Sequence, residues 1–253
     1  MAVVFMDLDG TLLDNGKPAA NIVETITLLK ANGHIPIIAT GRVPHLLYDV
    51  RETLGIDSYI AANGNFIFYD GKVIHERYIP KNIVERLLHE ADNKGFDLAI
   101  EGARGYVAYR KETDLVRSFS EVFHIEEPIV DRNFTDHNEV LAFVVFEDDI
   151  VPMLRDKFPE LVFNRSNRFG YDVNLHGGLK VNGVRFMIEY LKLSEDDVYA
   201  IGDGYNDIDM LASVKNSIAM GNAYPEVKAV CKYITASVNE DGVRKAMEHF
   251  GLI

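Results

Sequence analysis

The chain has 253 residues, 47% of them hydrophobic, and its 39 acidic and 26 basic residues give a formal net charge of -13 at pH 7. This length can bury one large core or two modest ones, and the acidic balance argues against nucleic acid or an anionic membrane surface as a partner. The single cysteine cannot form an internal disulfide, and no apolar run reaches the length of a membrane span. We therefore expect a soluble, cytoplasmic protein.

The first 65 residues alternate between short apolar runs and helical patterns, which is typical of a parallel α/β sheet. A capping box, in which Glu24 lies three residues after Asn21, predicts the start of the first helix, and Gly33 predicts its end. The predicted elements are, in order, a strand over 2–6, a helix from 21 to 33, a strand over 35–39, a helix over 44–54 and a strand over 59–62.

The pattern changes after the third strand. Two strand-like runs, 66–69 and 72–75, flank Asp70-Gly71, which is a strong signal for a two-residue hairpin. Clustered strands with helices between them then indicate an α+β module with an antiparallel sheet, which we place at residues 82–178. Its predicted strands are 96–101, 105–109, 140–146, 161–163 and 170–175, and its predicted helices are 82–94, 113–123 and 149–158.

The α/β pattern returns after residue 178. A helix over 181–191 precedes a strand over 198–201, and strands over 217–220 and 233–235 follow, with Pro225 placed at the first turn of the helix between them. The predicted fold class is therefore α/β: one core with a parallel sheet, formed by residues 1–81 and 179–253, that carries an inserted α+β domain at 82–178.

Polar residues of complementary types follow three of the core strands or open a core helix. They are Asp7 and Asp9 after the first strand, Thr40 after the second, Lys180 at a helix start, and Asp203, Asn206 and Asp207 after a later strand. If these strands are parallel neighbours, the groups meet at one carboxyl edge of the sheet. Hard oxygen ligands suit Mg²⁺, and Asp7 and Asp203 are its natural ligands there.

Such a set of groups suits phosphoryl transfer, which depends largely on positioning and charge stabilisation. A hydroxyl and an ammonium can hold phosphoryl oxygens, and a carboxylate can itself attack to give an aspartyl phosphate. A second carboxylic acid can protonate the leaving oxygen and then activate water. Taken singly, Asp9-Gly10 could be only a turn, Thr40-Gly41 only a helix cap and Lys180 only a solvated charge.

Zinc is not indicated, because the eight histidines form no cluster with ligand spacing such as a helical pair. We interpret Arg42 as a structural contact or a contact at the edge of the substrate. Five charged residues of the predicted insert lie near strand ends or in loops, where they could contact the distal part of a substrate or be ordinary surface charges. They are Glu101, Arg104, Arg165, Arg168 and Asp172.

The ordered set of motifs resembles the haloacid dehalogenase superfamily, and it spans nearly the whole chain. The four motifs that carry the resemblance are Asp7-Leu8-Asp9-Gly10-Thr11-Leu12, Thr40-Gly41-Arg42, Lys180 and Gly202-Asp203-Gly204-Tyr205-Asn206-Asp207. Features similar to those of the Cof-type branch are Asn63-Gly64, Met220-Gly221-Asn222-Ala223 and Asn239-Glu240-Asp241-Gly242-Val243. Lys180-Val181 departs from the Lys-Gly that is usual in this branch.

The resemblance implies a Rossmann-like core with a C2-type cap that closes over the site and selects the substrate. It implies that Asp7 is the nucleophile and Asp9 the general acid/base. It implies a phosphoryl group bound by Thr40, Gly41, Lys180 and Asn206, Mg²⁺ held by Asp7, the Asp9 backbone carbonyl and Asp203, and an outer supporting role for Asp207. We add Arg42 to this outer group because of its position after Thr40-Gly41.

The predicted function is that of a Mg²⁺-dependent phosphatase acting on small phosphorylated metabolites, either sugar phosphates or phosphorylated cofactors. One alternative is a phosphomutase, which would need an activating bisphosphate. Another is a non-enzymatic phospho-acceptor domain of the receiver kind, although such domains are about half this length and lack a large insert. The sequence predicts neither the identity of the substrate nor the oligomeric state.

Overall fold

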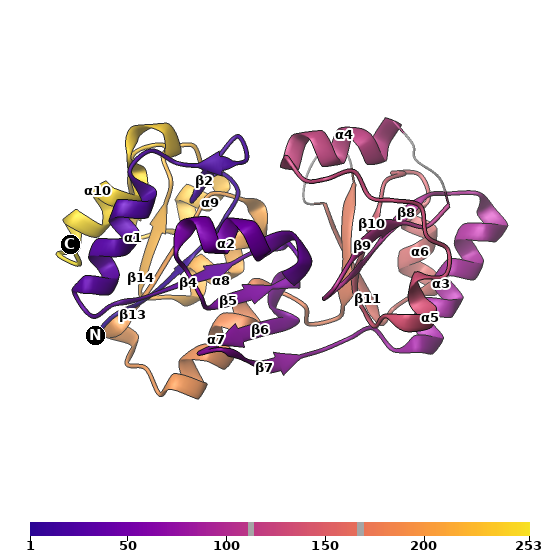
Figure 1. Ribbon diagram of the computed structural model, residues 1–253, viewed down its shortest axis with the longest axis horizontal. Helices are drawn as coiled ribbons and strands as arrows, with labels where there is room; N and C mark the ends of the chain where they lie inside the picture. The colour runs from indigo at the N-terminus through magenta and orange to yellow at the C-terminus, as the bar shows by residue number, and fades with distance from the viewer. Residues whose placement is uncertain (111–113, 166–169) are drawn as a thin grey trace.

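The structure is a computed structural model that describes residues 1–110, 114–165 and 170–253 (Figure 1). Among these residues the strands form an eight-stranded sheet, a five-stranded sheet and a two-stranded sheet. The larger sheets belong to two lobes that lie side by side (Figure 1). The strands of the eight-stranded sheet are β1 (Val3–Met6), β4 (Ile35–Ala39), β5 (Tyr59–Ala61), β6 (Phe66–Tyr69), β7 (Lys72–Glu76), β13 (Val198–Gly202), β14 (Asn216–Ala219) and β15 (Tyr233–Ile234).

The large sheet has the order β15-β14-β13-β1-β4-β5-β6-β7, so the first strand of the chain lies near its middle. The strands from β15 to β5 are parallel to their neighbours, and β6 and β7 are added as an antiparallel hairpin. All four residues of β1 are buried, as expected for a parallel strand that is covered on both faces. The mainly parallel core sheet predicted from the sequence is confirmed.

Helices cover this sheet and complete one hydrophobic core, in which Phe5, Leu29, Met187 and Ile201 are among the fully buried side chains. The helices of this lobe are α1 (Ile22–Ala31), α2 (Tyr48–Leu54), α7 (Lys180–Leu191), α8 (Ile208–Ser213), α9 (Pro225–Val230) and α10 (Gly242–His249), with the 3-10 turns η1 (Pro44–Leu47), η2 (Ala62–Gly64), η3 (Glu195–Asp197), η4 (Tyr205–Asp207) and η5 (Val238–Glu240).

The smaller lobe is an antiparallel sheet of order β11-β12-β10-β8-β9 with a core of its own around Phe96 and Phe143. Helices α3 and α6 pack on one face of this sheet, and α4 lies on the opposite face. Its elements are α3 (Lys81–Lys94), β8 (Leu98–Gly102), β9 (Tyr106–Ala108), α4 (Asp114–Phe123), α5 (Phe134–His137), β10 (Val140–Val145), α6 (Val151–Lys157), β11 (Leu161–Arg165) and β12 (Tyr171–Leu175). The predicted α+β insert is therefore confirmed as a fold class.

The chain passes between the lobes at two places. The backbone N–H of Arg77 donates to Asn65 in the large lobe, whereas that of Ile79 donates to Val140 in the small one. The chain returns just before α7, where the N–H of Gly178 still donates to Leu175 of β12. We propose on this basis that the inserted domain begins between Arg77 and Ile79, slightly before the start at residue 82 that the sequence predicts, and ends near Gly178.

Two local expectations need correction. The capping box at Asn21 is wrong, because this residue has a φ of 55° and makes no side-chain cap; its amide donates instead to Asp241. The helix predicted over 44–54 begins as a 3-10 turn. The sequence also gave no signal for α5 or for the small hairpin of β2 (Leu13–Asp14) and β3 (Lys17–Pro18), which are too short for a periodic pattern.

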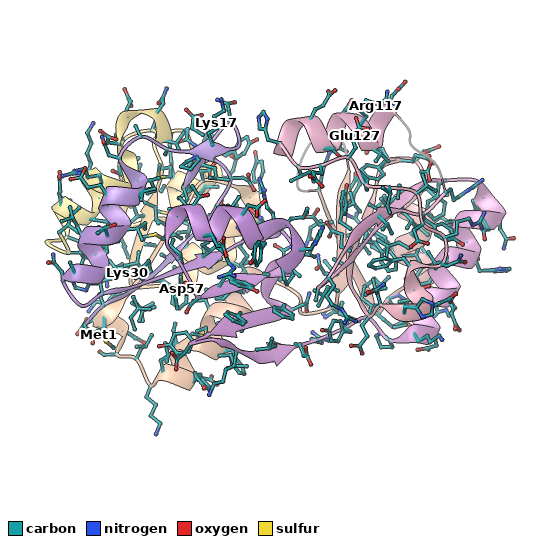
Figure 2. The ribbon with its side chains drawn as sticks, viewed as in Figure 1. Met1, Lys17, Lys30, Asp57, Arg117 and Glu127 are labelled. Carbon is teal, nitrogen blue, oxygen red and sulfur yellow. The ribbon has the colours of Figure 1, made fainter. Side chains whose placement is uncertain are left out.

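The two hydrophobic cores contribute more to stability than the ion pairs on the surface do. Exposed ion pairs such as Lys30–Asp57 and Arg117–Glu127, each 3.5 Å apart, lie on the outside of the large and small lobes (Figure 2), where a pair contributes about 0–1 kcal/mol. Within the described ranges, no helix combines the length and apolar character needed to cross a bilayer.

Candidate active site

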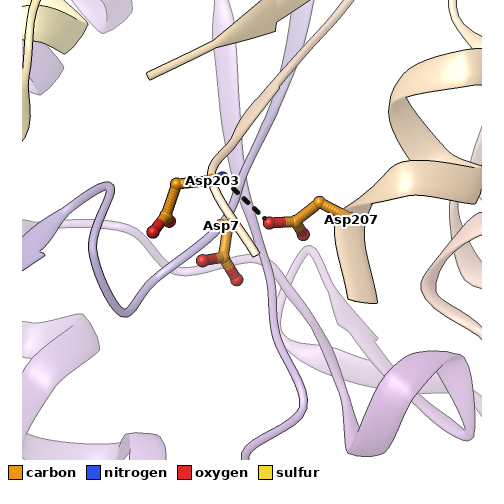
Figure 3. Close-up of side chains that lie close together, drawn as sticks. All are labelled: Asp7, Asp203 and Asp207. Carbon is orange, nitrogen blue, oxygen red and sulfur yellow. Dashed lines mark hydrogen bonds between the residues drawn. The ribbon is translucent and has the colours of Figure 1, made fainter. Parts of the chain in front are cut away.

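The parallel pairing of β1 with β13 brings together carboxylates that are almost 200 residues apart in the sequence. Met6 lies opposite Ile201 in the register, so Asp7 and Asp203 leave the sheet at the same edge. Asp207 joins them from η4, and one carboxylate oxygen of each residue lies within 4.8 Å of the others (Figure 3). The predicted convergence at the carboxyl edge therefore occurs in the structure.

Lys180 enters this cluster as the first residue of α7. Its side chain is fully buried, and Nζ donates to Asp7 Oδ1 at 2.5 Å and to Asp207 Oδ1 at 2.7 Å. A glycine makes this approach possible: Gly64 has a φ of +93°, and a Cβ there would lie 2.7 Å from the Leu179 carbonyl oxygen. The departure at Val181 does not disturb the helix start, because α7 still begins at Lys180.

Asp207 holds the loop after β13 in place. Its Oδ2 accepts hydrogen bonds from the backbone N–H groups of Asp203 and Gly204 at 3.0 and 2.9 Å, while its Oδ1 accepts from Lys180. Both oxygens are thus already used by the protein. One oxygen of Asp207 nevertheless lies within 4.8 Å of oxygens of Asp7 and Asp203, so the three carboxylates together form a group that can hold a metal ion.

Asp203 is oriented by two residues that the sequence analysis did not assign to the site. Thr11 Oγ1 donates to its Oδ1 at 2.9 Å, and Asn222 Nδ2 donates to its Oδ2 at 3.2 Å. Gly10 leaves room for this carboxylate, because a Cβ at Gly10 would lie 2.3 Å from Oδ2. Thr11 and Asn222 lie inside motifs that carry the family resemblance, but the motifs alone do not show where these side chains point.

Asp9 forms a two-point ion pair with Arg42. Arg42 Nε donates to Asp9 Oδ2 at 2.9 Å, and Nη2 donates to Oδ1 at 2.5 Å, a geometry that fixes the carboxylate plane. The Arg42 backbone N–H also donates to Thr40 Oγ1 at 3.1 Å. The structure therefore gives Arg42 a definite partner at the end of the neighbouring strand.

A cavity of about 200 Å³ lies over this edge, between the lobes. It brings together most of the predicted site residues and adds Leu46 and Tyr224 from the large lobe. Its lining is Asp7, Asp9, Thr40, Gly41, Arg42, Leu46, Glu101, Ile125, Asp172, Asp203, Gly204, Asn206 and Tyr224. Lys180 is not part of this lining. It lines a neighbouring cavity, and Asn206 and Asp172 line both cavities.

The charged residues of the small lobe are divided by the structure. Glu101 and Asp172, for which the sequence left both interpretations open, line the site cavity. Arg165 lines the neighbouring cavity and donates to Asp148. Arg104 lines a different cavity, beside Tyr78 and His137. Arg168 lies outside the described residues.

The charge balance of the cluster favours a cation. Burial, together with the negative charge of Asp207, raises the pKa of Asp7 well above its ordinary value. The same two causes raise the pKa of Asp203 to about 7. Burial alone would lower the pKa of Lys180, but the carboxylates of Asp207 and Asp7 raise it above its ordinary value. One buried ammonium is thus set against three carboxylates, and an all-oxygen donor set of this kind fits Mg²⁺.

Glu101 is the most perturbed carboxyl of the small lobe. Its side chain is buried, and this burial, followed by the negative charge of Asp172, raises its pKa from 4.5 to about 8. The folded protein therefore binds a proton between these two pH values that the unfolded chain has released. Because the native state binds more protons in that window, stability falls as pH rises from about 4.5 to 8.

We therefore expect Glu101→Gln to weaken this pH dependence. Between pH 5 and pH 8 the parent should lose up to about 3 kcal/mol more of its free energy of unfolding than the variant loses, because Gln cannot ionise. Urea unfolding at the two pH values measures this difference. Glu85→Gln, at an exposed position on α3, is the control, and an identical pH dependence in Glu101→Gln and the parent would contradict the expectation.

Comparison with known proteins agrees with this geometry. A family model described as haloacid dehalogenase-like hydrolase matches residues 4–247. The putative phosphatase YkrA of Bacillus subtilis (strain 168) is 34% identical over 264 residues, covering 99% of this chain and 98% of the relative. The 5-amino-6-(5-phospho-D-ribitylamino)uracil phosphatase YcsE of the same organism is 30% identical over 259 residues, covering 99% and 96%.

The solved structures include a similar one for which an activity is named. The HAD subclass IIB sugar phosphatase BT4131 superposes with a TM-score of 0.86 at 28% sequence identity, and the match covers 100% of both chains. The fold, the ordered motifs and the family model therefore agree over almost the entire sequence. The chain belongs to the family of haloacid dehalogenase-like hydrolases.

Proposed function

We propose that this enzyme is a Mg²⁺-dependent phosphatase that hydrolyses small phosphorylated metabolites through an aspartyl phosphate on Asp7. Family membership and the named relatives already make it a phosphoric monoester hydrolase. The observation that carries the finer proposal is the position of the Asp7 carboxylate: it lines the cavity floor while one of its oxygens accepts a hydrogen bond from buried Lys180.

Asp7 is the best-placed nucleophile. Lys180 holds Oδ1, which leaves Oδ2 to attack a phosphorus atom in the cavity. The bond from Oδ2 to phosphorus forms as the bond from phosphorus to the leaving alcohol oxygen breaks. The ammonium of Lys180 also favours the ionised, nucleophilic form of the carboxylate, which burial alone would suppress.

Asp9 is the best-placed acid/base. It lines the same cavity, two residues after Asp7, and its carboxylate is oriented by Arg42. In the first half of the reaction it gives a proton to the leaving alcohol oxygen, and in the second half it takes one from the water that attacks phospho-Asp7. Arg42 acts through Asp9, as a positioning residue.

The remaining lining groups hold the phosphoryl oxygens. Thr40, Gly41 and Asn206 border the cavity beside Asp7 and offer hydroxyl, backbone N–H and amide donors. Asp7, Asp203 and the backbone carbonyl of Asp9 would hold Mg²⁺. When bound, the ion neutralises charge that develops on the phosphoryl oxygens.

The size of the cavity supports a small substrate. Its volume of about 200 Å³ lies below the roughly 300–1,000 Å³ that is typical of sites for drug-sized ligands. A sugar phosphate or a phosphorylated cofactor precursor fits this limit, in agreement with the substrates named for BT4131 and YcsE. The receiver-like alternative is wrong, because the family match is to hydrolases.

Removal of divalent ions should abolish turnover of p-nitrophenyl phosphate. We expect excess EDTA to lower kcat at least 100-fold and added Mg²⁺ to restore it, because Asp7 and Asp203 otherwise repel the incoming phosphate. Asp203→Asn should raise the Mg²⁺ concentration for half-maximal activity at least tenfold, since one ligand charge is lost. Asp209→Asn, at an exposed position beyond the cluster, is the matched control. Full activity in EDTA would contradict the metal dependence.

A phosphomutase would differ in its product. It would convert a hexose monophosphate to its isomer when an activating bisphosphate is present, whereas a phosphatase releases inorganic phosphate from the same substrate. Assays for phosphate and for the isomer in one reaction mixture distinguish the two activities.

A further inference from the structure

Three consecutive residues after β5 have a left-handed backbone. The φ angles of Ala62, Asn63 and Gly64 are 49°, 51° and 93°. Glycine adopts this conformation freely, but in an alanine it brings Cβ too close to the following carbonyl oxygen. Such strain persists where the surrounding contacts impose it, and it is concentrated at functional sites. The contacts of this turn therefore indicate what it is for.

The backbone of the turn holds the loop that follows β4. The N–H of Ala62 donates to the carbonyl oxygen of Arg42 at 2.9 Å, and the N–H of Asn63 donates to that of Thr40 at 3.1 Å. The N–H of Gly41, which lies between these two carbonyl groups in the chain, makes no hydrogen bond within the part of the chain that the structure describes. It is therefore available to a phosphoryl oxygen, as a fixed backbone donor.

The side chain of Asn63 packs against the same loop. A Cβ built on Gly41 would lie 3.3 Å from Asn63 Oδ1 and 3.4 Å from Nδ2, so the amide group lies alongside the Gly41 backbone. Asn63 is 5% exposed, and its Oδ1 is buried without a hydrogen-bond partner among the described residues. A buried acceptor without a partner lowers stability. Stability of the fold therefore does not explain the amide at this position.

The other end of the turn contacts the start of the helix that carries Lys180. A Cβ built on Gly64 would lie 2.7 Å from the carbonyl oxygen of Leu179. Asn63 itself lines a cavity of about 280 Å³ together with Lys180 and Asn206. The turn thus lies between the loop after β4 and α7, and it sets the spacing of two segments that are proposed to hold the phosphoryl group.

We propose, resting on the function proposed above, that Asn63 is a positioning residue for phosphoryl binding: its side chain fixes Gly41 so that the Gly41 N–H donates to a phosphoryl oxygen. Asn63 acts through Gly41 and takes no part in bond making or proton transfer. Without this side chain the loop is free to shift, and a displacement of about 1 Å at a binding group can lower the rate roughly 100-fold. The strained turn and the unpaired oxygen then lower stability in favour of activity.

Asn63→Gly tests the side chain without disturbing the backbone, because glycine adopts a φ of 51° freely. With p-nitrophenyl phosphate at saturating Mg²⁺, we expect kcat/KM to fall at least about tenfold and the inhibition constant of inorganic phosphate to rise by a similar factor. The Mg²⁺ concentration for half-maximal activity should not change, because Asp7 and Asp203 keep their partners. The urea midpoint should stay close to that of the parent, since the unpaired oxygen is removed with the side chain.

Asn65 offers a matched control from the same loop. It is also buried, but its Nδ2 donates to the carbonyl oxygen of Ala62 at 3.0 Å and to Asn174 Oδ1 at 3.2 Å. Asn65→Ala should therefore lower the urea midpoint, while the folded variant keeps an inhibition constant for phosphate close to that of the parent. An unchanged inhibition constant in Asn63→Gly, or a loss of stability as large as that in Asn65→Ala, would overturn the proposal.

Failure of this inference can be distinguished from failure of the proposed function. If the parent releases no phosphate from p-nitrophenyl phosphate, the phosphatase assignment is wrong, and calorimetric titration with inorganic phosphate and Mg²⁺ then decides the role of Asn63. Weaker phosphate binding by Asn63→Gly than by the parent supports that role, whereas equal binding, or no binding by the parent, contradicts it. If the parent is active and Asn63→Gly equals it, only the role of Asn63 is wrong.

A second variant keeps the test decisive if Asn63→Gly does not fold. Asn63→Asp retains the shape of the side chain, and aspartate tolerates the left-handed conformation. Its carboxylate would lie beside Gly41 and repel the phosphate, so the inhibition constant of phosphate should rise while the urea midpoint stays close to that of the parent. An unchanged inhibition constant in this variant would show that Asn63 does not act on the phosphoryl site.

Discussion

Asp7→Asn should lower kcat at least about 10⁴-fold, an effect of the size seen when a covalent nucleophile is removed. The amide has the shape of the carboxylate, and its oxygen can still accept the hydrogen bond from Lys180. It is not nucleophilic, however, and no acyl phosphate can form. Steady-state release of phosphate from p-nitrophenyl phosphate measures the loss, and a cooperative thermal transition shows that the variant is folded.

Asp9→Asn is the informative contrast, because Asp7 is proposed to be the nucleophile and Asp9 the general acid/base. The nitrophenolate leaving group needs little protonation, so this variant should still transfer phosphate to Asp7. It lacks the base that activates water, so the phosphoenzyme should accumulate. Acid quenching with labelled substrate should trap label on Asp9→Asn and none on Asp7→Asn. Trapped label in both variants, or equal residual turnover in both, would contradict this division of roles.

The sequence predicted the part of the site that follows from strand topology. Three apolar runs that end in polar residues suffice to place Asp7, Thr40 and Asp203 at one edge, because parallel strands share their carboxyl end. Lys180 was predicted from its position in the ordered motifs, and the structure buries it between two carboxylates. These positions can be predicted from the sequence because they depend on where each strand ends and not on which side chains contact one another.

Side-chain partnerships were not predictable in the same way. Arg42 was open to two interpretations, and only the distance between β1 and β4 shows that it reaches Asp9. The roles of Thr11 and Asn222 in orienting Asp203 depend on turns whose geometry is set by Gly10 and its neighbours. These contacts join segments that are far apart in the sequence, and local patterns do not encode them.

Glu101 and Asp172 were left undecided for a related reason. Every residue of β8 is buried, and Tyr171 and Asp172 of β12 are half-buried, so alternation of polar and apolar residues could not show which face meets the core. The capping box at Asn21 failed because a contact with Asp241 outweighs the local signal. In each case a tertiary contact decides between interpretations that are equally good locally.

Lys180→Met should have the largest effect on stability of any single substitution in the site. Lys180 is fully buried and neutralises Asp7 and Asp207, and removing one partner of a buried ion pair costs about 3–5 kcal/mol because a charge is left uncompensated. The free energy of unfolding in urea, measured in EDTA at pH 7, should fall by that amount. Activity should fall at least about 10³-fold even where the variant is folded, since Asp7 loses the group that holds Oδ1.

A double variant separates the two effects. In Lys180→Met/Asp207→Asn one of the stranded charges is removed as well, and we expect it to be more stable than Lys180→Met alone, while catalysis stays lost because Asp7 still lacks its ammonium. Lys245→Met, an exposed position on α10, should change stability by less than about 0.5 kcal/mol. If Lys180→Met is as stable as Lys245→Met, the buried charges are compensated by another group, and the network of Asp7, Lys180 and Asp207 does not hold the site together.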